Sequence, residues 1–245
     1  MTTAATASAA SAPDPPLVAA VRAALSGAGD PVRAAGQQAY MKSAMPYRGI
    51  TSPELRALLR PLLADPALAP TTRVGWESAV RTVWDDAAYR EERYAAIALS
   101  GHRAAHSWQD PAALGLYRHL VETGAWWDLV DPVAADRVWP ILLTHREVVT
   151  PTIRGWAVDD DLWVRRTAVL AQLKHHEATD VELLADVLDA NLEGSLHGRE
   201  FFVRKAVGWA LRQYARTDPD WVRAYVASRG TRLSGLSRRE ALKHL

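Results

Sequence analysis

Apolar residues recur three or four positions apart along nearly the whole chain beyond residue 16, and no segment alternates convincingly between apolar and polar residues. A spacing of three to four brings side chains onto one face of an α-helix, whereas strict alternation is typical of a strand. The pattern therefore predicts an all-α protein of about a dozen short helices. Such helices are too many and too short for a simple helix bundle.

Helix start signals fall between these segments. Thr51-Ser52-Pro53-Glu54 has the spacing of a capping box with proline in the first turn, and Asp218-Pro219 is typical of an N-cap followed by proline. The Ser/Thr-x-x-Glu spacing returns at Thr179–Glu182 and at Ser237–Glu240. Each of these four sites predicts the start of a helix.

An internal repeat indicates how the helices are arranged. The segment Trp163–Val169 aligns with Phe202–Gly208 at a shift of 39 residues, and Glu92–Ile97 fits the same frame roughly two periods earlier. A period of this length is typical of helical pairs in HEAT and armadillo repeats, which stack into a solenoid with a concave face. We therefore expect an all-α, HEAT-like helical-repeat solenoid.

The first sixteen residues, MTTAATASAASAPDPP, are small, polar and rich in proline. They lack the basic start and apolar stretch of a secretory signal, so we expect a disordered tail over 1–16 and a single domain over 17–245. No apolar run is long enough to span a membrane, and we expect a cytoplasmic protein. Cysteine is absent, which excludes disulfides, thiolate catalysis and cysteine-ligated zinc.

Charge is unevenly distributed although the net charge is only +1. Residues 101–200 carry nine Lys/Arg against sixteen Asp/Glu, a balance of −7, and residues 201–245 carry ten against three, a balance of +7. The basic end of the chain would attract phosphate. A solvated, arginine-rich helix face explains the same pattern equally well.

The sequence Trp126-Trp127-Asp128-Leu129-Val130-Asp131-Pro132 is the densest candidate for chemistry. On a helix, Trp127 and Asp131 share one face, and an indole beside a carboxylate suits a flat, cationic ligand. Two structural explanations stay open. Asp131 before Pro132 also fits an N-cap, and paired tryptophans often pack in a core. Pro132 can also break or kink the helix beside the carboxylate.

Other candidates are less specific. Gly208-Trp209 with Arg212 fits a ligand that approaches the backbone closely, or simply a packed helix pair. Arg165 and Arg166 suit phosphate binding or a structural role in a repeat. His102 and His106 have the spacing of two metal ligands on a helix. No Glu follows His102 as in the zinc-protease motif and no cysteine is available, so we expect no metal site. No phosphate-binding glycine loop, G-x-S-x-G elbow or dinucleotide fingerprint is present, which disfavours those enzyme classes.

Taken together, several motifs resemble those of the AlkD-type DNA alkylation repair glycosylases. They arrive in the family's order and span roughly residues 37–245. They are Tyr40-Met41-Lys42, Pro46–Glu54, Arg90-Glu91-Glu92, Trp126–Asp131, Leu162–Arg166, Glu200–Trp209 and Leu236–His244.

The resemblance implies a HEAT-like solenoid whose concave face binds double-stranded DNA. It implies an enzyme that excises N3- and N7-alkylated purines without metal or cofactor and without full base flipping. Separately from the resemblance, we expect a monomer. Asp131, Trp127 and Trp209 fall on the family's catalytic positions, Arg166 on its cleft arginine, and Tyr40 on a position near the lesion. We assign Arg166 and Arg212 to phosphate binding.

The implied chemistry is coherent. Alkylation at N3 or N7 makes the purine cationic and a good leaving group, so no general acid is required. Asp131 would stabilise the positive charge that develops on the deoxyribose, and Trp127 and Trp209 would flank the sugar. Two alternatives remain: a non-catalytic HEAT-like scaffold that binds DNA or protein, and a binder of branched or bulged DNA with a vestigial pocket.

Overall fold

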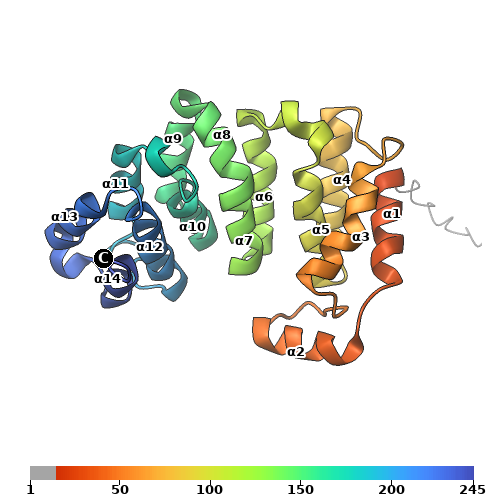
Figure 1. Ribbon diagram of the computed structural model, residues 1–245, viewed down its shortest axis with the longest axis horizontal. Helices are drawn as coiled ribbons and strands as arrows, with labels where there is room; N and C mark the ends of the chain where they lie inside the picture. The colour runs from red at the N-terminus through yellow and green to blue at the C-terminus, as the bar shows by residue number, and fades with distance from the viewer. Residues whose placement is uncertain (1–14) are drawn as a thin grey trace, which may run out of the picture. The chain divides into compact units, whose positions relative to one another are not determined.

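The computed structural model describes residues 15–245, and every regular element in that range is helical, as the periodicity predicts (Figure 1). The predicted tail lies outside the described residues except at its end, where the first helix already begins at Pro16. The chain forms two compact units that divide after Ala104. The prediction of a single domain over 17–245 and that of a concave DNA-binding face therefore stay predictions.

Over residues 15–104, the first unit is built on four helices that pack against one another, with a fifth that lies beside them. Trp76 and Trp84 are fully buried in its core. The helices that form this core are α1 (Pro16–Ser26), α3 (Ser52–Ala64), α4 (Arg73–Asp85) and α5 (Arg90–Ser100), and the fifth helix is α2 (Pro31–Met41).

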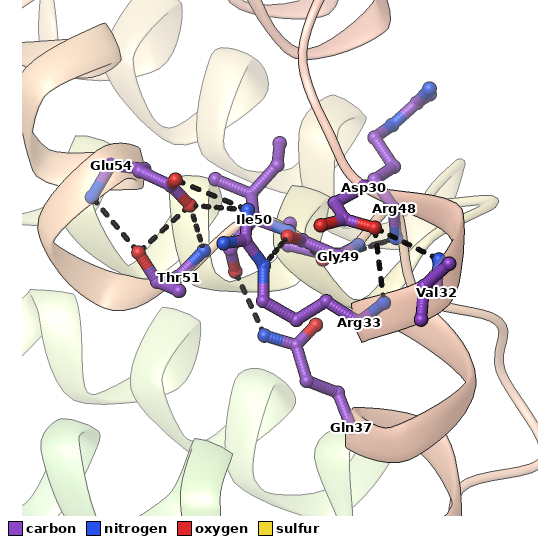
Figure 2. A network of polar contacts seen from close by, with 10 residues as sticks. Asp30, Val32, Arg33, Gln37, Arg48, Gly49, Ile50, Thr51 and Glu54 are labelled. Carbon is purple, nitrogen blue, oxygen red and sulfur yellow. Dashed lines mark hydrogen bonds and ion pairs between the residues drawn. The ribbon is translucent and has the colours of Figure 1, made fainter.

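Polar contacts attach α2 to the segment that leads into α3 (Figure 2). Asp30 caps α2 by accepting hydrogen bonds from two backbone N–H groups of its first turn, and the backbone N–H of Asp30 donates to the Arg48 carbonyl oxygen at 2.9 Å. Arg33 donates to the Gly49 carbonyl oxygen and pairs with Glu54 at 2.9 Å. Of the residues in α2, Met41 is buried, so this helix depends on polar contacts more than on apolar packing.

The second unit consists of successive helices that stand side by side in chain order (Figure 1). In its middle, α10 packs against both α7 and α12. The helices are α6 (Leu114–Gly124), α7 (Trp127–Val133), a π-turn (Ala134–Val138), α8 (Trp139–Thr144), α9 (Arg146–Ala157), α10 (Leu162–Leu170), α11 (Val181–Asp189), α12 (Phe201–Tyr214), α13 (Pro219–Arg229) and α14 (Gly235–Ala241).

The internal repeat corresponds to two of these neighbouring helices, α10 and α12. Trp163 and Phe202, which the repeat aligns, lie in contact with their ring centroids 5.0 Å apart. Equivalent positions of the two segments therefore stack directly on each other, as expected of a helical repeat.

Two of the four predicted helix starts are confirmed. Thr51 accepts a hydrogen bond from the Glu54 backbone N–H, and the Glu54 carboxylate accepts one in return from the Thr51 N–H at 2.7 Å. Asp218 caps α13 by accepting a hydrogen bond from the Trp221 N–H.

The other two starts are displaced. Asp180, not Thr179, caps α11, and Ser234, not Ser237, caps α14. Ser237 lies inside α14, where its hydroxyl group donates to the Arg204 carbonyl oxygen at 2.8 Å. A Ser/Thr-x-x-Glu spacing shows that a cap is near, but neighbouring residues that can also cap compete for the position.

The N-cap interpretation of Asp131 is wrong, because Asp131 is the fifth residue of α7. Pro132 does not end the helix. Backbone angles stay helical through Val133 and Ala134, and a π-turn then leads into α8. A π-turn relieves local mismatch in a helix that lacks one hydrogen bond, and such turns are frequent at functional sites. The Asp131 side chain therefore projects from an intact helix.

Candidate functional site

An ion pair between Asp131 and Arg166 is the centre of the candidate site. The Arg166 Nε donates to Oδ1 of Asp131 at 2.7 Å, and Nη2 donates to Oδ2 at 2.8 Å. The Arg166 side chain is 5% exposed and that of Asp131 is 14% exposed. A bidentate pair of this kind fixes both the direction and the plane of the carboxylate.

The pair joins three helices. Asp131 lies on α7 and Arg166 on α10, and the Arg166 Nη1 donates to the backbone oxygen of Phe202 on α12. Asp161 starts α10 by accepting hydrogen bonds from two N–H groups of its first turn, at 2.8 and 2.9 Å. The start of α10 and the packing on either side of it therefore determine where the carboxylate lies.

The two neighbouring arginines of α10 have different roles. Arg165 donates to the backbone oxygens of Val158, at 3.0 Å, and of Ala190, at 3.3 Å, and so ties loops together. Consecutive helical residues point about 100° apart, so Arg166 faces Asp131 instead. Each nitrogen of the Arg166 guanidinium already donates one hydrogen bond within the protein. The assignment of Arg166 to phosphate binding stays a prediction.

Burial raises the pKa of Asp131 above its ordinary value. The Arg166 guanidinium opposes this rise, and the negative charge of Asp128, three residues earlier, adds to it. Asp131 therefore takes up a proton at a higher pH than an exposed aspartate does.

The adjacent tryptophans at the start of α7 differ in their surroundings. Trp126 packs into an aromatic cluster, with ring centroids 5.9 Å from Trp163 and 5.1 Å from Phe202. Trp127, the first residue of α7, is half-buried, and so is Trp209 on α12, which packs against the core of the second unit. Trp126 is half-buried as well, and its ring contacts with Trp163 and Phe202 account for its position. The assignment of Trp127 and Trp209 to the walls of the site stays a prediction.

Gly208 provides close helix packing. A Cβ atom at this position would lie 2.6 Å from the Glu240 Cβ and 3.0 Å from the Ser237 Cα on α14. Arg212, one turn further along α12, forms an ion pair with Glu240, which Lys205 also approaches at 3.2 Å. These pairs join residues 28 and 35 positions apart, and no local sequence signal indicates them. Any phosphate bound by Arg212 would have to compete with Glu240.

Replacing Gly208 by Ala is expected to lower the free energy of unfolding by about 1–3 kcal/mol, because the added methyl group has no room against α14. Gly155 on α9 is the matched control, since a Cβ atom there meets nothing within 4 Å. Gly155→Ala should stabilise the protein by up to about 1 kcal/mol through helix propensity. Urea denaturation, monitored by circular dichroism, measures the change in the free energy of unfolding for both substitutions. Equal effects of the two substitutions would contradict the close packing of α12 and α14.

The remaining predicted site residues lie in the first unit. Tyr40 is on α2 and is 78% exposed, so its ring is available to a ligand; its placement near a lesion stays a prediction. His102 is buried, and its Nδ1 accepts a hydrogen bond from the Ala104 N–H. His102 and His106 do not share a face of an α-helix, because a 3₁₀-helix begins at Arg103. Within residues 15–245, no three potential ligands gather around a metal position, and no helix is long and apolar enough to cross a bilayer.

Comparison with known proteins identifies relatives of this arrangement. A family model described as "DNA alkylation repair enzyme" matches residues 21–245. A solved structure titled "Predicted DNA alkylation repair enzyme from Enterococcus faecalis" has a TM-score of 0.77 and 30% sequence identity, and the match covers 89% of this chain and 96% of that one. No curated protein matches the chain. The chain therefore belongs to the DNA alkylation repair enzyme family.

Proposed function

We propose that this protein is a DNA glycosylase of the AlkD type, which removes cationic N3- and N7-alkylated purines from duplex DNA. The observation that carries the proposal is a partly exposed carboxylate, Asp131, held in one orientation by Arg166. Each carboxylate oxygen uses one lone pair for Arg166 and keeps another for a ligand or a water molecule.

The reaction needs little from the protein beyond electrostatics. The bond between C1′ and the purine nitrogen breaks, and its electron pair neutralises the cationic base, which leaves. Positive charge then develops on the deoxyribose, where the Asp131 carboxylate stabilises it. Water adds to C1′ and loses a proton, which leaves an abasic site. Trp127 and Trp209 would offer their ring faces to the cationic sugar and exclude bulk water.

Arg166 acts in this proposal as a positioning residue. The Asp131–Arg166 pair is neutral as a whole, so it stabilises a cation only if the carboxylate lies nearer to the cation than the guanidinium does. The Arg166 guanidinium is buried and also donates to the backbone of α12, whereas the Asp131 carboxylate is partly exposed.

The pH dependence of base release tests this role. Ionised Asp131 is the active form, so release should fall as the pH drops through a pKa that burial has raised above its ordinary value. Arg166 lowers that pKa, so Arg166→Gln should move the acid limb to a higher pH. Single-turnover release across pH, corrected for spontaneous depurination, gives both profiles. If the acid limb of the variant's pH profile lay at the same pH as that of the wild type, Arg166 would have no influence on the ionisation of Asp131.

Identification of released bases tests the function itself. Duplex DNA treated separately with a methylating agent and with an agent that forms bulky adducts is incubated with the protein, and free bases are identified by mass spectrometry. The proposal predicts free N3- or N7-alkylpurines and abasic sites in equal amounts. Tight DNA binding without any free base would instead favour the non-catalytic scaffold.

A further inference from the structure

An open groove of about 670 Å³ lies in the first unit, between α3 and the end of α5. Arg56 and Arg60, one helical turn apart on α3, form its rim together with Arg103, which follows α5. Leu59 and Leu63 contribute to an aliphatic floor. No acidic side chain of the described part of the chain lines the groove.

The three rim arginines are exposed, and among residues 15–245 they take part in no ion pair or side-chain hydrogen bond. The arginines of the candidate site differ in this respect, because Arg166 pairs with Asp131 and Arg212 with Glu240. Burial lowers the pKa of the neighbouring His102, so its imidazole is neutral at pH 7. The positive charge of the groove therefore comes from three guanidinium groups that have no counter-ion in the part of the chain that the structure describes.

We propose that this groove binds the sugar–phosphate backbone of duplex DNA, as a contact additional to the site around Asp131. A DNA strand alternates an anionic phosphate with a deoxyribose whose C–H faces are apolar, which matches an arginine rim over an aliphatic floor. Among the described residues, no phenylalanine, tyrosine or tryptophan lines the groove, and the His102 side chain is buried, so the groove lacks the stacking platform that unpaired bases require. The contact would supply affinity without sequence preference. It rests on the DNA substrate of the family and not on the glycosylase chemistry.

The salt dependence of binding to undamaged duplex DNA tests the proposal. Each phosphate contact adds about 0.9 to the slope of log K against log salt concentration. The variant Arg56→Gln/Arg60→Gln/Arg103→Gln should therefore lose about 2 to 3 from the magnitude of that slope. The triple lysine variant at the same positions should keep the wild-type slope, because it keeps the charges.

The matched control is Arg154→Gln/Arg199→Gln/Arg223→Gln, which removes the same charge from exposed arginines that already pair with acidic neighbours. Its slope should change by less than that of the groove variant. An unchanged slope in the groove variant, or an equal fall in the lysine variant, would overturn the proposal. So would selective loss of polyglutamate binding with intact duplex binding, which would indicate an acidic polypeptide partner. Because undamaged DNA releases no base, the result does not depend on whether Asp131 is catalytic.

Discussion

Replacing Asp131 by Asn is expected to slow the single-turnover release of 7-methylguanine from duplex DNA by about 100- to 1,000-fold. The amide keeps the size of the carboxylate and can still accept a hydrogen bond from Arg166. It cannot supply the negative charge that stabilises the cationic sugar. Binding to the methylated duplex, measured by fluorescence anisotropy, should survive, because binding depends on phosphate contacts.

The substitution also leaves the buried Arg166 guanidinium without a counter-charge, which costs about 3–5 kcal/mol of stability. Asp189→Asn provides the control, since Asp189 forms a second bidentate pair with Arg229, at 2.8 and 2.6 Å, between α11 and α13. This variant should lose stability through a broken pair but keep base release. If both variants lost release equally, the effect of Asp131→Asn would be structural. If Asp131→Asn kept full activity, Asp131 would have no catalytic role.

Removal of the Glu91 carboxylate should have a large effect on stability. Glu91 on α5 is fully buried, and its Oε1 accepts hydrogen bonds from the backbone N–H groups of Arg48, Gly49 and Ile50 at 3.0, 2.9 and 3.1 Å. Glu91→Ala leaves three donors without an acceptor, at an expected cost of about 3–5 kcal/mol. Glu91→Gln keeps one accepting oxygen and should cost less.

Two measurements check this expectation. Urea denaturation gives the loss of stability, and hydrogen exchange gives the protection of the amides at residues 48–50, which should fall in both variants. Glu77→Gln on α4 is the control, because Glu77 is half-buried in a 3.6 Å pair with Arg73 and should lose about 1 kcal/mol or less. If Glu91→Ala cost no more than this control, the carboxylate would not be what holds the segment before α3.

The helical fold was predictable because each helix carries its own signal. The capping box at Thr51 and the proline after Asp218 are local, and the structure confirms both. The interpretation of Asp131 as an N-cap failed for a non-local reason. Helical backbone angles continue past Pro132 into a π-turn, and the helix packs against α10, which lies about 30 residues further along the chain. Local residue preference could not reveal this.

The candidate site was predictable as a set of residue types but not as a set of contacts. A sequence does not show that Arg166 rather than Arg165 faces Asp131, because that depends on how α10 is rotated between its neighbours. Nor does it show that Trp126 rather than Trp127 packs into the aromatic cluster. Glu91 belongs to one of the motifs that resemble the family. The motif does not show that the Glu91 carboxylate accepts hydrogen bonds from the backbone of the segment before α3.

The most direct test of the account compares two lesions at one position of the same duplex. In 7-methylguanine the base is cationic, whereas in O6-methylguanine it is neutral and would need a proton to leave. Because the proposed site offers a carboxylate and no general acid, the account predicts release of 7-methylguanine and retention of O6-methylguanine. Comparable release of both bases would contradict it.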